Sequence, residues 1–158
     1  MAKIIGIDLG TTFSGIAYVN GHGTPVTVKN REGEPVTPSA VAIESDREVI
    51  VGQAARDMAI THPDRVAINF KRDMGDEFFH RRVGGREFSP EALSALVLRR
   101  LKDDFEENFG TVAGAVITVP AYFGDRRRRA TEDAGRIAER AEVLFDDADA
   151  VRGLEDFL

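Results

Sequence analysis

Residues 7–14 read Ile7-Asp8-Leu9-Gly10-Thr11-Thr12-Phe13-Ser14. A β-rich apolar run at residues 3–8 ends in Asp8, so this aspartate falls where a short strand stops. An aspartate in that position points away from the edge of a sheet, where its carboxylate can hold a hydrated Mg²⁺ ion. Gly10 allows a sharp turn whose following N–H groups can face phosphate oxygens, and Thr11 and Thr12 add hydroxyl donors. The pattern indicates a loop that cradles phosphate or, as the simpler alternative, a polar hairpin turn.

The surroundings of this stretch differ from those of a Walker phosphate loop. A Walker loop carries Gly-Lys-Ser/Thr and opens a helix, whereas here the chain continues into a second expected strand at residues 14–19. A third strand is expected at residues 25–29, after the turn signal at residues 20–23. A hairpin is expected to join residues 40–43 to residues 48–51. The opening third of the chain is therefore predicted to be an antiparallel meander.

Helical periodicity dominates the rest of the chain. A helix is expected at residues 53–60, and a longer one at residues 89–110, where Ser-Pro supplies the N-cap and the first helical position. A buried strand is expected at residues 115–119 because this run is apolar and β-branched, and another helix opens at residues 124–125. A meander followed by alternating helix, strand and helix predicts an α/β fold with a mixed sheet.

The composition is that of an ordinary globular domain. The chain has 158 residues, of which 42% are hydrophobic and 30% charged, and its net charge is −6. This acidic balance argues against a nucleic-acid partner or an anionic membrane surface, and the basic cluster at residues 126–129 is expected on a solvated helix face. No cysteine is present, which excludes disulfides and thiolate chemistry. The chain start lacks the apolar run of a signal peptide and no stretch reaches the ~20 apolar residues of a membrane span, so a cytoplasmic location is expected.

Several segments combine into a specific set of motifs. They are Ile4-Ile5-Gly6-Ile7-Asp8-Leu9-Gly10-Thr11-Thr12, Thr37-Pro38-Ser39, Val51-Gly52-Gln53-Ala54-Ala55, Phe70-Lys71-Arg72, Ala115-Val116-Ile117-Thr118-Val119-Pro120-Ala121-Tyr122-Phe123 and Arg128-Arg129-Ala130-Thr131 with Asp133-Ala134-Gly135-Arg136-Ile137-Ala138. In this order they resemble the amino-terminal part of the nucleotide-binding domain of the heat-shock protein 70 (DnaK-type) chaperones. The spacing between Lys71 and Ser89 is most similar to that of the short, specialised bacterial members.

The resemblance implies an actin- or ribonuclease-H-like ATPase lobe. Residues 1–138 would be an incomplete first lobe, and residues 139–158 a divergent acidic tail with seven acidic residues against two arginines. Within the tail, residues 142–145 suit a strand and residues 153–158 a short amphipathic turn, although a frameshift product is an equal alternative.

The resemblance also assigns roles around the first motif. Asp8 would hold Mg²⁺ through water, and Gly10, Thr11 and Thr12 would contact the β- and γ-phosphates of ATP or ADP. Phe13 stands where relatives carry polar or tyrosyl side chains, so that only its backbone would contribute to phosphate binding.

Three further residues receive roles by resemblance alone. Lys71 would reach the γ-phosphate and orient the attacking water; taken by itself, Lys71 next to Arg72 reads as a solvated surface pair. Pro120 and Arg128 would belong to the relay that links the nucleotide state to substrate binding, whereas Pro120 alone is most simply a strand terminator. The three histidines have no partners at ligand spacing and receive no role.

Later elements of the family domain have no counterpart in this sequence. Relatives continue beyond the segment matching residues 133–138 with a catalytic glutamate, a second Asp-Leu-Gly-Gly-Gly-Thr loop and an adenosine motif. A truncated chaperone ATPase lobe is therefore expected, with weak ATP binding and no turnover on its own. Unfolded polypeptide clients and co-chaperones would be partners only of a full-length form. The alternatives are a non-catalytic interaction module and a non-functional gene remnant.

Overall fold

Two β-sheets and the helices packed against them make up residues 2–45 and 47–140, the part of the chain that the computed structural model describes. The larger sheet contains β1 (Lys3–Asp8), β2 (Phe13–Val19), β3 (Pro25–Val28), β4 (Thr37–Pro38) and β8 (Val112–Ile117). Its strand order is β3-β2-β1-β8, and β4 pairs with the start of β2. The strand expected at residues 142–145 and the turn expected at residues 153–158 lie outside the described residues.

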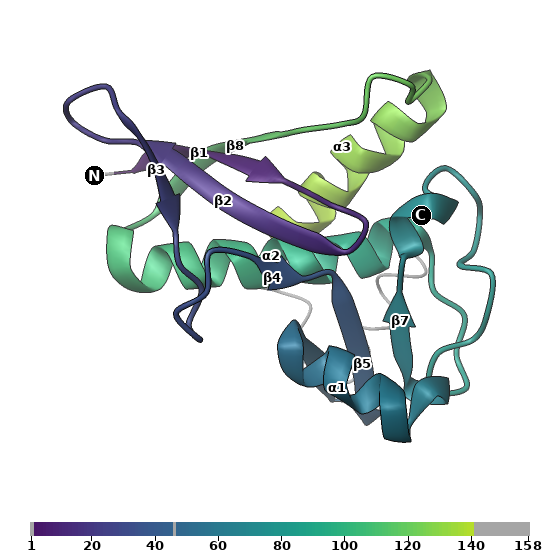
Figure 1. Ribbon diagram of the computed structural model, residues 1–158. Helices are drawn as coiled ribbons and strands as arrows, with labels where there is room; N and C mark the ends of the chain where they lie inside the picture. The colour runs from purple at the N-terminus through teal and green to yellow at the C-terminus, as the bar shows by residue number, and fades with distance from the viewer. Residues whose placement is uncertain (1, 46, 141–158) are drawn as a thin grey trace.

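The larger sheet is mixed, as the sequence predicts. β1 pairs antiparallel with β2 and parallel with β8 (Figure 1). The turn between β2 and β3 is closed by Asn20, whose Oδ1 accepts hydrogen bonds from the N–H groups of His22 and Thr24. Because β1 and β8 are parallel, their carboxyl ends reach the same edge of the sheet, which places Asp8 beside the residues that follow β8.

The smaller sheet confirms the expected hairpin. It contains β6 (Glu48–Val51), β5 (Ala40–Ser45) and β7 (Val66–Ile68) in that order, with both pairings antiparallel. The helix α1 (Gln53–Thr61) packs on it through Ala55, which is completely buried against Ala40, Ala42 and Val66. Two short 3₁₀ turns, η1 (Pro63–Arg65) and η2 (Phe70–Asp73), lead away from this sheet.

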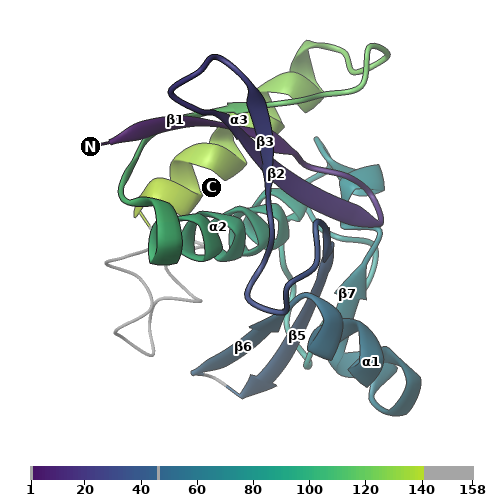
Figure 2. The same cartoon turned by 60° about the vertical axis from the view of Figure 1, so that its left-hand side comes forward.

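Helix α2 (Pro90–Phe109) joins the two sheets. It starts as predicted at Ser89, whose Oγ accepts a hydrogen bond of 3.1 Å from the N–H of Ala92, and it ends at Gly110 with φ 87°. One side of α2 packs with α3 (Asp125–Arg140) under the larger sheet, and the other side packs on the smaller sheet (Figure 2). None of the helices within residues 2–45 and 47–140 is both long and apolar enough to cross a bilayer.

A buried ion-pair network fastens a long loop to α2. The carboxylate of Asp104 on α2, 1% exposed, binds Arg31 at 2.6 Å and Arg100 at 3.1 Å. Arg100 also donates to the Val51 carbonyl at 2.7 Å and binds Glu32 at 2.6 Å. The loop between β3 and β4 is thereby held against the middle of the helix.

The strand expected at residues 115–119 is present as β8, but the prediction that it is buried is wrong. The strand β8 lies at the edge of the sheet, and Val116 is 65% exposed, although Ile117 packs on the core. Ile4 and Val19 on neighbouring strands are also exposed. No described helix covers this outer face, so apolar side chains there remain open to solvent.

Candidate functional site

The carboxylate of Asp8 stands at the end of β1 and is exposed. The hydroxyl of Thr118, the first residue after β8, donates a hydrogen bond of 2.9 Å to Asp8 Oδ1. The N–H of Thr118 also donates to the Ile7 carbonyl at 2.9 Å, which continues the pairing of the two parallel strands. This arrangement fixes one carboxylate oxygen, and no described residue donates a hydrogen bond to the other oxygen, which could accept from a ligand.

Residues 9–12 form the connection between β1 and β2, which we term the β1–β2 loop. Leu9 anchors the loop with a side chain that is 1% exposed. A Cβ at Gly10 would lie 1.8 Å from the carbonyl oxygen of Phe13, so only glycine fits this turn. The N–H of Gly10 donates to Ser14 Oγ at 3.1 Å, whereas no partner within residues 2–45 and 47–140 accepts from the N–H groups of Thr11 and Thr12.

Lys71 lies beneath the β1–β2 loop. It sits on η2, and Asn69 in front of it adopts a left-handed conformation with φ 58°. The Lys71 side chain is buried and its Nζ donates to the carbonyl of Leu9. Arg72, by contrast, is exposed. A solvated surface pair is therefore the wrong description of Lys71.

Burial sets the charge properties of Lys71. Loss of solvent lowers the pKa of its ammonium group, and the nearby negative charge of Asp8 raises it in part. The ring of Phe123 lies 5.6 Å from Nζ and covers the cation from another side. The described residues give this ammonium group few partners. An anion bound near Asp8 and the β1–β2 loop would therefore interact favourably with the positive charge of Lys71.

Phe13 points away from the loop interior. Its side chain is 42% exposed and lies under the guanidinium of Arg56 on α1, with 5.1 Å between Arg56 Cζ and the ring centroid. The side chain of Phe13 therefore packs against a neighbouring helix.

The residues expected in a relay meet through Phe123. The N–H of Phe123 donates to the Pro120 carbonyl at 3.0 Å, and Arg128 Nε donates to the Phe123 carbonyl at 2.9 Å. Phe123 is 4% exposed and its ring faces Lys71. The structure thus connects Pro120 and Arg128 to the underside of the β1–β2 loop through one buried aromatic residue.

A comparison with protein families gives the identity of this arrangement. The family model described as Hsp70 protein matches residues 4–84 and 79–141. The chain belongs to the Hsp70 family. The resemblance seen in the sequence is thereby confirmed, together with the actin- or ribonuclease-H-like α/β fold. The family is one of chaperone-type ATPase domains that in general use nucleotide and Mg²⁺.

The residues of this Hsp70 chain fit a Mg²⁺–phosphate site of the kind in which the ion keeps its water shell. Within the described residues, no group of three His, Asp or Glu side chains is placed to ligate a metal directly. Mg²⁺ retains several waters and uses one or two carboxylates together with phosphate oxygens. A single exposed Asp8 next to loop amides meets that requirement.

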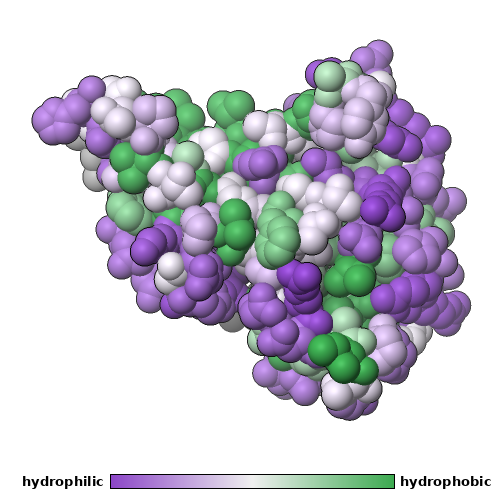
Figure 3. All heavy atoms as spheres, viewed as in Figure 1, coloured by the Kyte–Doolittle hydropathy of each residue, from purple (hydrophilic) through white to green (hydrophobic). Residues whose placement is uncertain are grey.

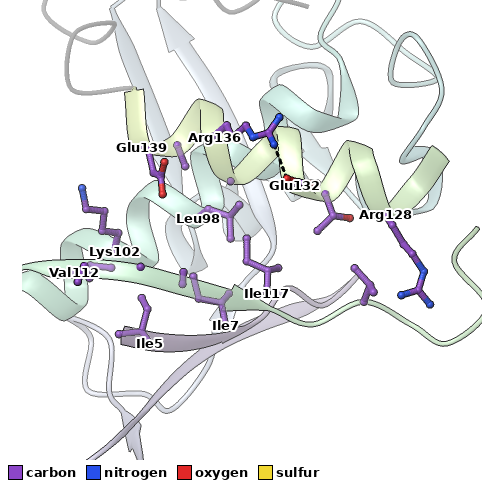
Figure 4. A pocket seen from close by; sticks show the side chains of 17 residues that line it. Ile5, Ile7, Leu98, Lys102, Val112, Ile117, Arg128, Glu132, Arg136 and Glu139 are labelled. Atoms are coloured by element: carbon purple, nitrogen blue, oxygen red, sulfur yellow. Dashed lines mark hydrogen bonds and ion pairs between the residues drawn. The ribbon is translucent and has the colours of Figure 1, made fainter. Parts of the chain in front are cut away.

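A cavity of the Hsp70 lobe lies away from the β1–β2 loop. It has a volume of about 780 Å³ and opens between β8, α2 and α3, with Ile5, Ile7 and Val112 along its floor (Figure 4). Charged side chains such as Lys102 and Glu139 stand only at its rim. Its apolar lining is the continuation of the core, and it shares no residue with the β1–β2 loop.

Sequence reasoning missed several residues of the site. Thr118 was placed inside the strand expected at residues 115–119, whereas β8 ends at Ile117 and its parallel pairing with β1 brings Thr118 beside Asp8. Ser14 and Ser39 were part of quoted motifs, but their contacts depend on the pairing of β2 with β4. Phe123 also lay in a quoted motif but received no role, and Arg56 gave no local signal because surface arginines are common.

Proposed function

We propose that residues 1–138 form the first lobe of an ATP-dependent Hsp70 chaperone domain and that the β1–β2 loop receives the phosphates of ATP. In this proposal Asp8 binds Mg²⁺ through water, while the backbone of Thr11, Thr12 and Phe13 faces the phosphates. Gly10 provides the turn.

The observation that carries the proposal is the position of Lys71. It lies 62 positions after Leu9 in the sequence, yet its ammonium group is buried against the carbonyl of that residue and interacts electrostatically with Asp8. Burying a cation costs free energy unless a partner compensates for it. One neutral carbonyl is a modest partner, and a polyphosphate is a stronger one. Lys71 is thus suited to stabilise charge that develops during phosphoryl transfer.

Mg²⁺ would shield phosphate charge and hold the phosphate oxygens in a fixed geometry when it is bound. The residues of this chain prepare for it in two ways. Thr118 orients the Asp8 carboxylate through the 2.9 Å hydrogen bond, and the N–H groups of Thr11 and Thr12, which have no acceptor among the described residues, can donate to phosphate oxygens. Lys71 completes a cationic side opposite Asp8.

The lobe on its own is expected to bind ATP weakly. Two loop amides and one lysine supply a few hydrogen bonds, each worth roughly 0.5–3 kcal/mol net. Loss of translational and rotational freedom costs on the order of 4–15 kcal/mol. The sequence has no second Asp-Leu-Gly-Gly-Gly-Thr motif to enclose the nucleotide, so hydrolysis by these residues alone is not expected.

Pro120 and Arg128 are proposed to pass the state of the site to other parts of a chaperone. Their hydrogen bonds to Phe123 support this, because the Phe123 ring faces the same ammonium group that would contact phosphate. Movement of Lys71 toward a ligand would change the packing of that ring.

Calorimetric titration of the purified chain with Mg-ATP tests the proposed site. Binding in the millimolar range or tighter is expected, with Asp8→Asn and Lys71→Met each weakening it. Arg72→Met is the matched control, because Arg72 is the exposed neighbour of Lys71. An absence of heat at millimolar nucleotide, or equal binding by all variants, would refute the proposal.

A second candidate function, an interaction module, is favoured by the open face of the larger sheet. Ile4, Val19 and Val116 on this face are 69%, 63% and 65% exposed. Figure 3 shows weakly polar and hydrophobic side chains across the strands, with hydrophilic surface around them. Light scattering tests this candidate function. If the chain is a monomer and forms no complex with an intact Hsp70, an interaction module is excluded.

A further inference from the structure

The backbone of Gly10 is enclosed in a ring of hydrogen bonds made with two serines. The N–H of Gly10 donates to Ser14 Oγ at 3.1 Å, and Ser39 Oγ donates to the Gly10 carbonyl at 2.8 Å. The two hydroxyl oxygens lie 2.8 Å apart. Because the Ser39 proton is already used on the Gly10 carbonyl, Ser14 must donate to Ser39. Each of the three residues in the ring then donates once and accepts once, an arrangement in which hydrogen bonds strengthen one another.

Both serines are held in place by the sheet. Ser14 is 1% exposed and Ser39 is 3% exposed. Ser14 pairs with Thr37 in the β2–β4 ladder, and the N–H of Ser39 donates to the Thr12 carbonyl at 2.9 Å. The loop is thus fastened at Gly10 by side chains and at Thr12 by backbone, and two buried hydroxyls have no other described partner.

We infer that Ser14 and Ser39 are positioning residues of the β1–β2 loop, which withdraw the N–H of Gly10 from a bound phosphate, hold its carbonyl in place and leave the N–H groups of Thr11 and Thr12 to donate to the phosphate. This inference rests on the proposed function of the loop. It changes the role expected for Gly10 from a phosphate contact to a turn held by two side chains. Thr11 and Thr12 come directly after Gly10 in the chain, so the direction in which their N–H groups point depends on the hydrogen-bond ring at Gly10.

Amide hydrogen exchange in the ligand-free full chain, followed by NMR, tests the ring without any nucleotide. The Gly10 amide is expected to exchange at least tenfold more slowly, relative to its random-coil rate, than the amides of Thr11 and Thr12. Ser14→Ala is expected to raise the Gly10 rate roughly 2- to 13-fold, as for the loss of one net hydrogen bond. Ser94→Ala is the matched control, because Ser94 on α2 is a completely buried serine whose Oγ has no described partner.

The wild-type chain alone can overturn the inference. A Gly10 amide that exchanges as fast as that of Thr11 contradicts the ring even if Ser14→Ala and Ser39→Ala fail to fold. Unchanged protection of Gly10 in a folded Ser14→Ala variant contradicts it as well. Equal acceleration by Ser94→Ala would show a general loss of stability and would also reject a positioning role.

A titration with Mg²⁺ and inorganic tripolyphosphate tests which amides meet phosphate. The signals of Thr11 and Thr12 are expected to shift most, and that of Gly10 least. Ser14→Ala is expected to weaken binding roughly 2- to 13-fold, whereas Ser94→Ala leaves it unchanged. A largest shift at Gly10 rejects the inference. If tripolyphosphate and Mg-ATP both fail to bind the wild-type chain, the proposed function is rejected instead, while the exchange data still decide whether the ring exists.

Discussion

The substitution Lys71→Met removes a buried charge while it keeps a side chain of similar length. Met loses the hydrogen bond from Nζ to the Leu9 carbonyl, which is worth about 1 kcal/mol net, and the exchange of shape costs less than about 1.5 kcal/mol. Relief from burying the ammonium group acts in the opposite direction. The free energy of unfolding is therefore expected to change by no more than about 1.5 kcal/mol in either direction.

The same substitution is expected to weaken nucleotide binding. A hydrogen bond to a charged group contributes about 1.5–3 kcal/mol, so the Kd for Mg-ATP should rise roughly 10- to 150-fold and the calorimetric signal should disappear. Lys71→Met is thus expected to change stability little and nucleotide binding strongly. If Lys71 only supported the fold, the substitution would lower stability and leave binding unchanged.

The pH dependence of stability, compared between the wild-type chain and Lys71→Met, provides a further test. Burial holds the pKa of Lys71 below its usual value of 10.5, so the unfolded chain binds this proton more tightly than the folded chain. The cost of burying the charge is fully present below the folded-state pKa. As the pH rises from that pKa toward 10.5, the wild-type chain should gain stability relative to Lys71→Met.

Urea denaturation at neutral and alkaline pH, together with calorimetry, measures these effects. Arg72→Met serves as the control and should match the wild-type chain in both assays. The reasoning is refuted if Lys71→Met loses more than about 3 kcal/mol, as for a broken buried ion pair, while Mg-ATP binding persists. A stability difference that does not vary with pH would also contradict it.

Three other substitutions, one of them with a matched control, have defined outcomes. Gly10→Ala places a Cβ against the Phe13 carbonyl, so a loss of roughly 1–3 kcal/mol and of Mg-ATP binding is expected by denaturation and calorimetry. Gly21→Ala, which meets nothing within 4 Å, should change neither quantity. Asp104→Ala leaves two arginines without their buried carboxylate; because they remain partly solvated, urea denaturation should show a loss of about 2–4 kcal/mol, and a loss below about 1 kcal/mol contradicts the network. Ser89→Ala removes the cap of α2 and should cost about 1 kcal/mol in the same assay, whereas an unchanged midpoint would show that the cap contributes nothing.

The parts of the fold that local sequence controls were predictable. The limits of α2 follow from a serine that caps the first turn, a proline that fits it and a glycine that ends the helix. The strand before Asp8 and the turn at Asn20 likewise depend on residues next to each other in the chain. In each case the determining contact lies within a few residues.

The parts that depend on distant neighbours were not predictable from local patterns. Apolar, β-branched residues in β8 indicate a strand, but they do not reveal that the strand lies at an edge and leaves Val116 exposed. A lysine next to an arginine gives no sign of burial, and Lys71 is buried because η2 brings it under a loop formed at the start of the chain. The resemblance to the family motifs predicted that Lys71 lies near the phosphate loop, whereas periodicity could not predict it.

The serine ring illustrates the same limit at the site. Gly10 was expected to contact phosphate, but its N–H already donates to Ser14. The bonds of Ser39 to Ser14 and to the Gly10 carbonyl require the pairing of β4 with β2, which depends on the path of residues 29–37 and on the attachment of that segment to α2 through Asp104. The sequence indicates which residues are present, whereas their hydrogen-bond partners follow from the tertiary arrangement.

A crystal structure of the chain with Mg²⁺ and a non-hydrolysable ATP analogue tests the central proposal most directly. The expected result is triphosphate over the β1–β2 loop, with phosphate oxygens accepting from the N–H groups of Thr11 and Thr12 and with Lys71 Nζ turned from Leu9 toward a phosphate. Nucleotide bound in the cavity between β8 and α3, or phosphates at the loop that Lys71 does not contact, would contradict it.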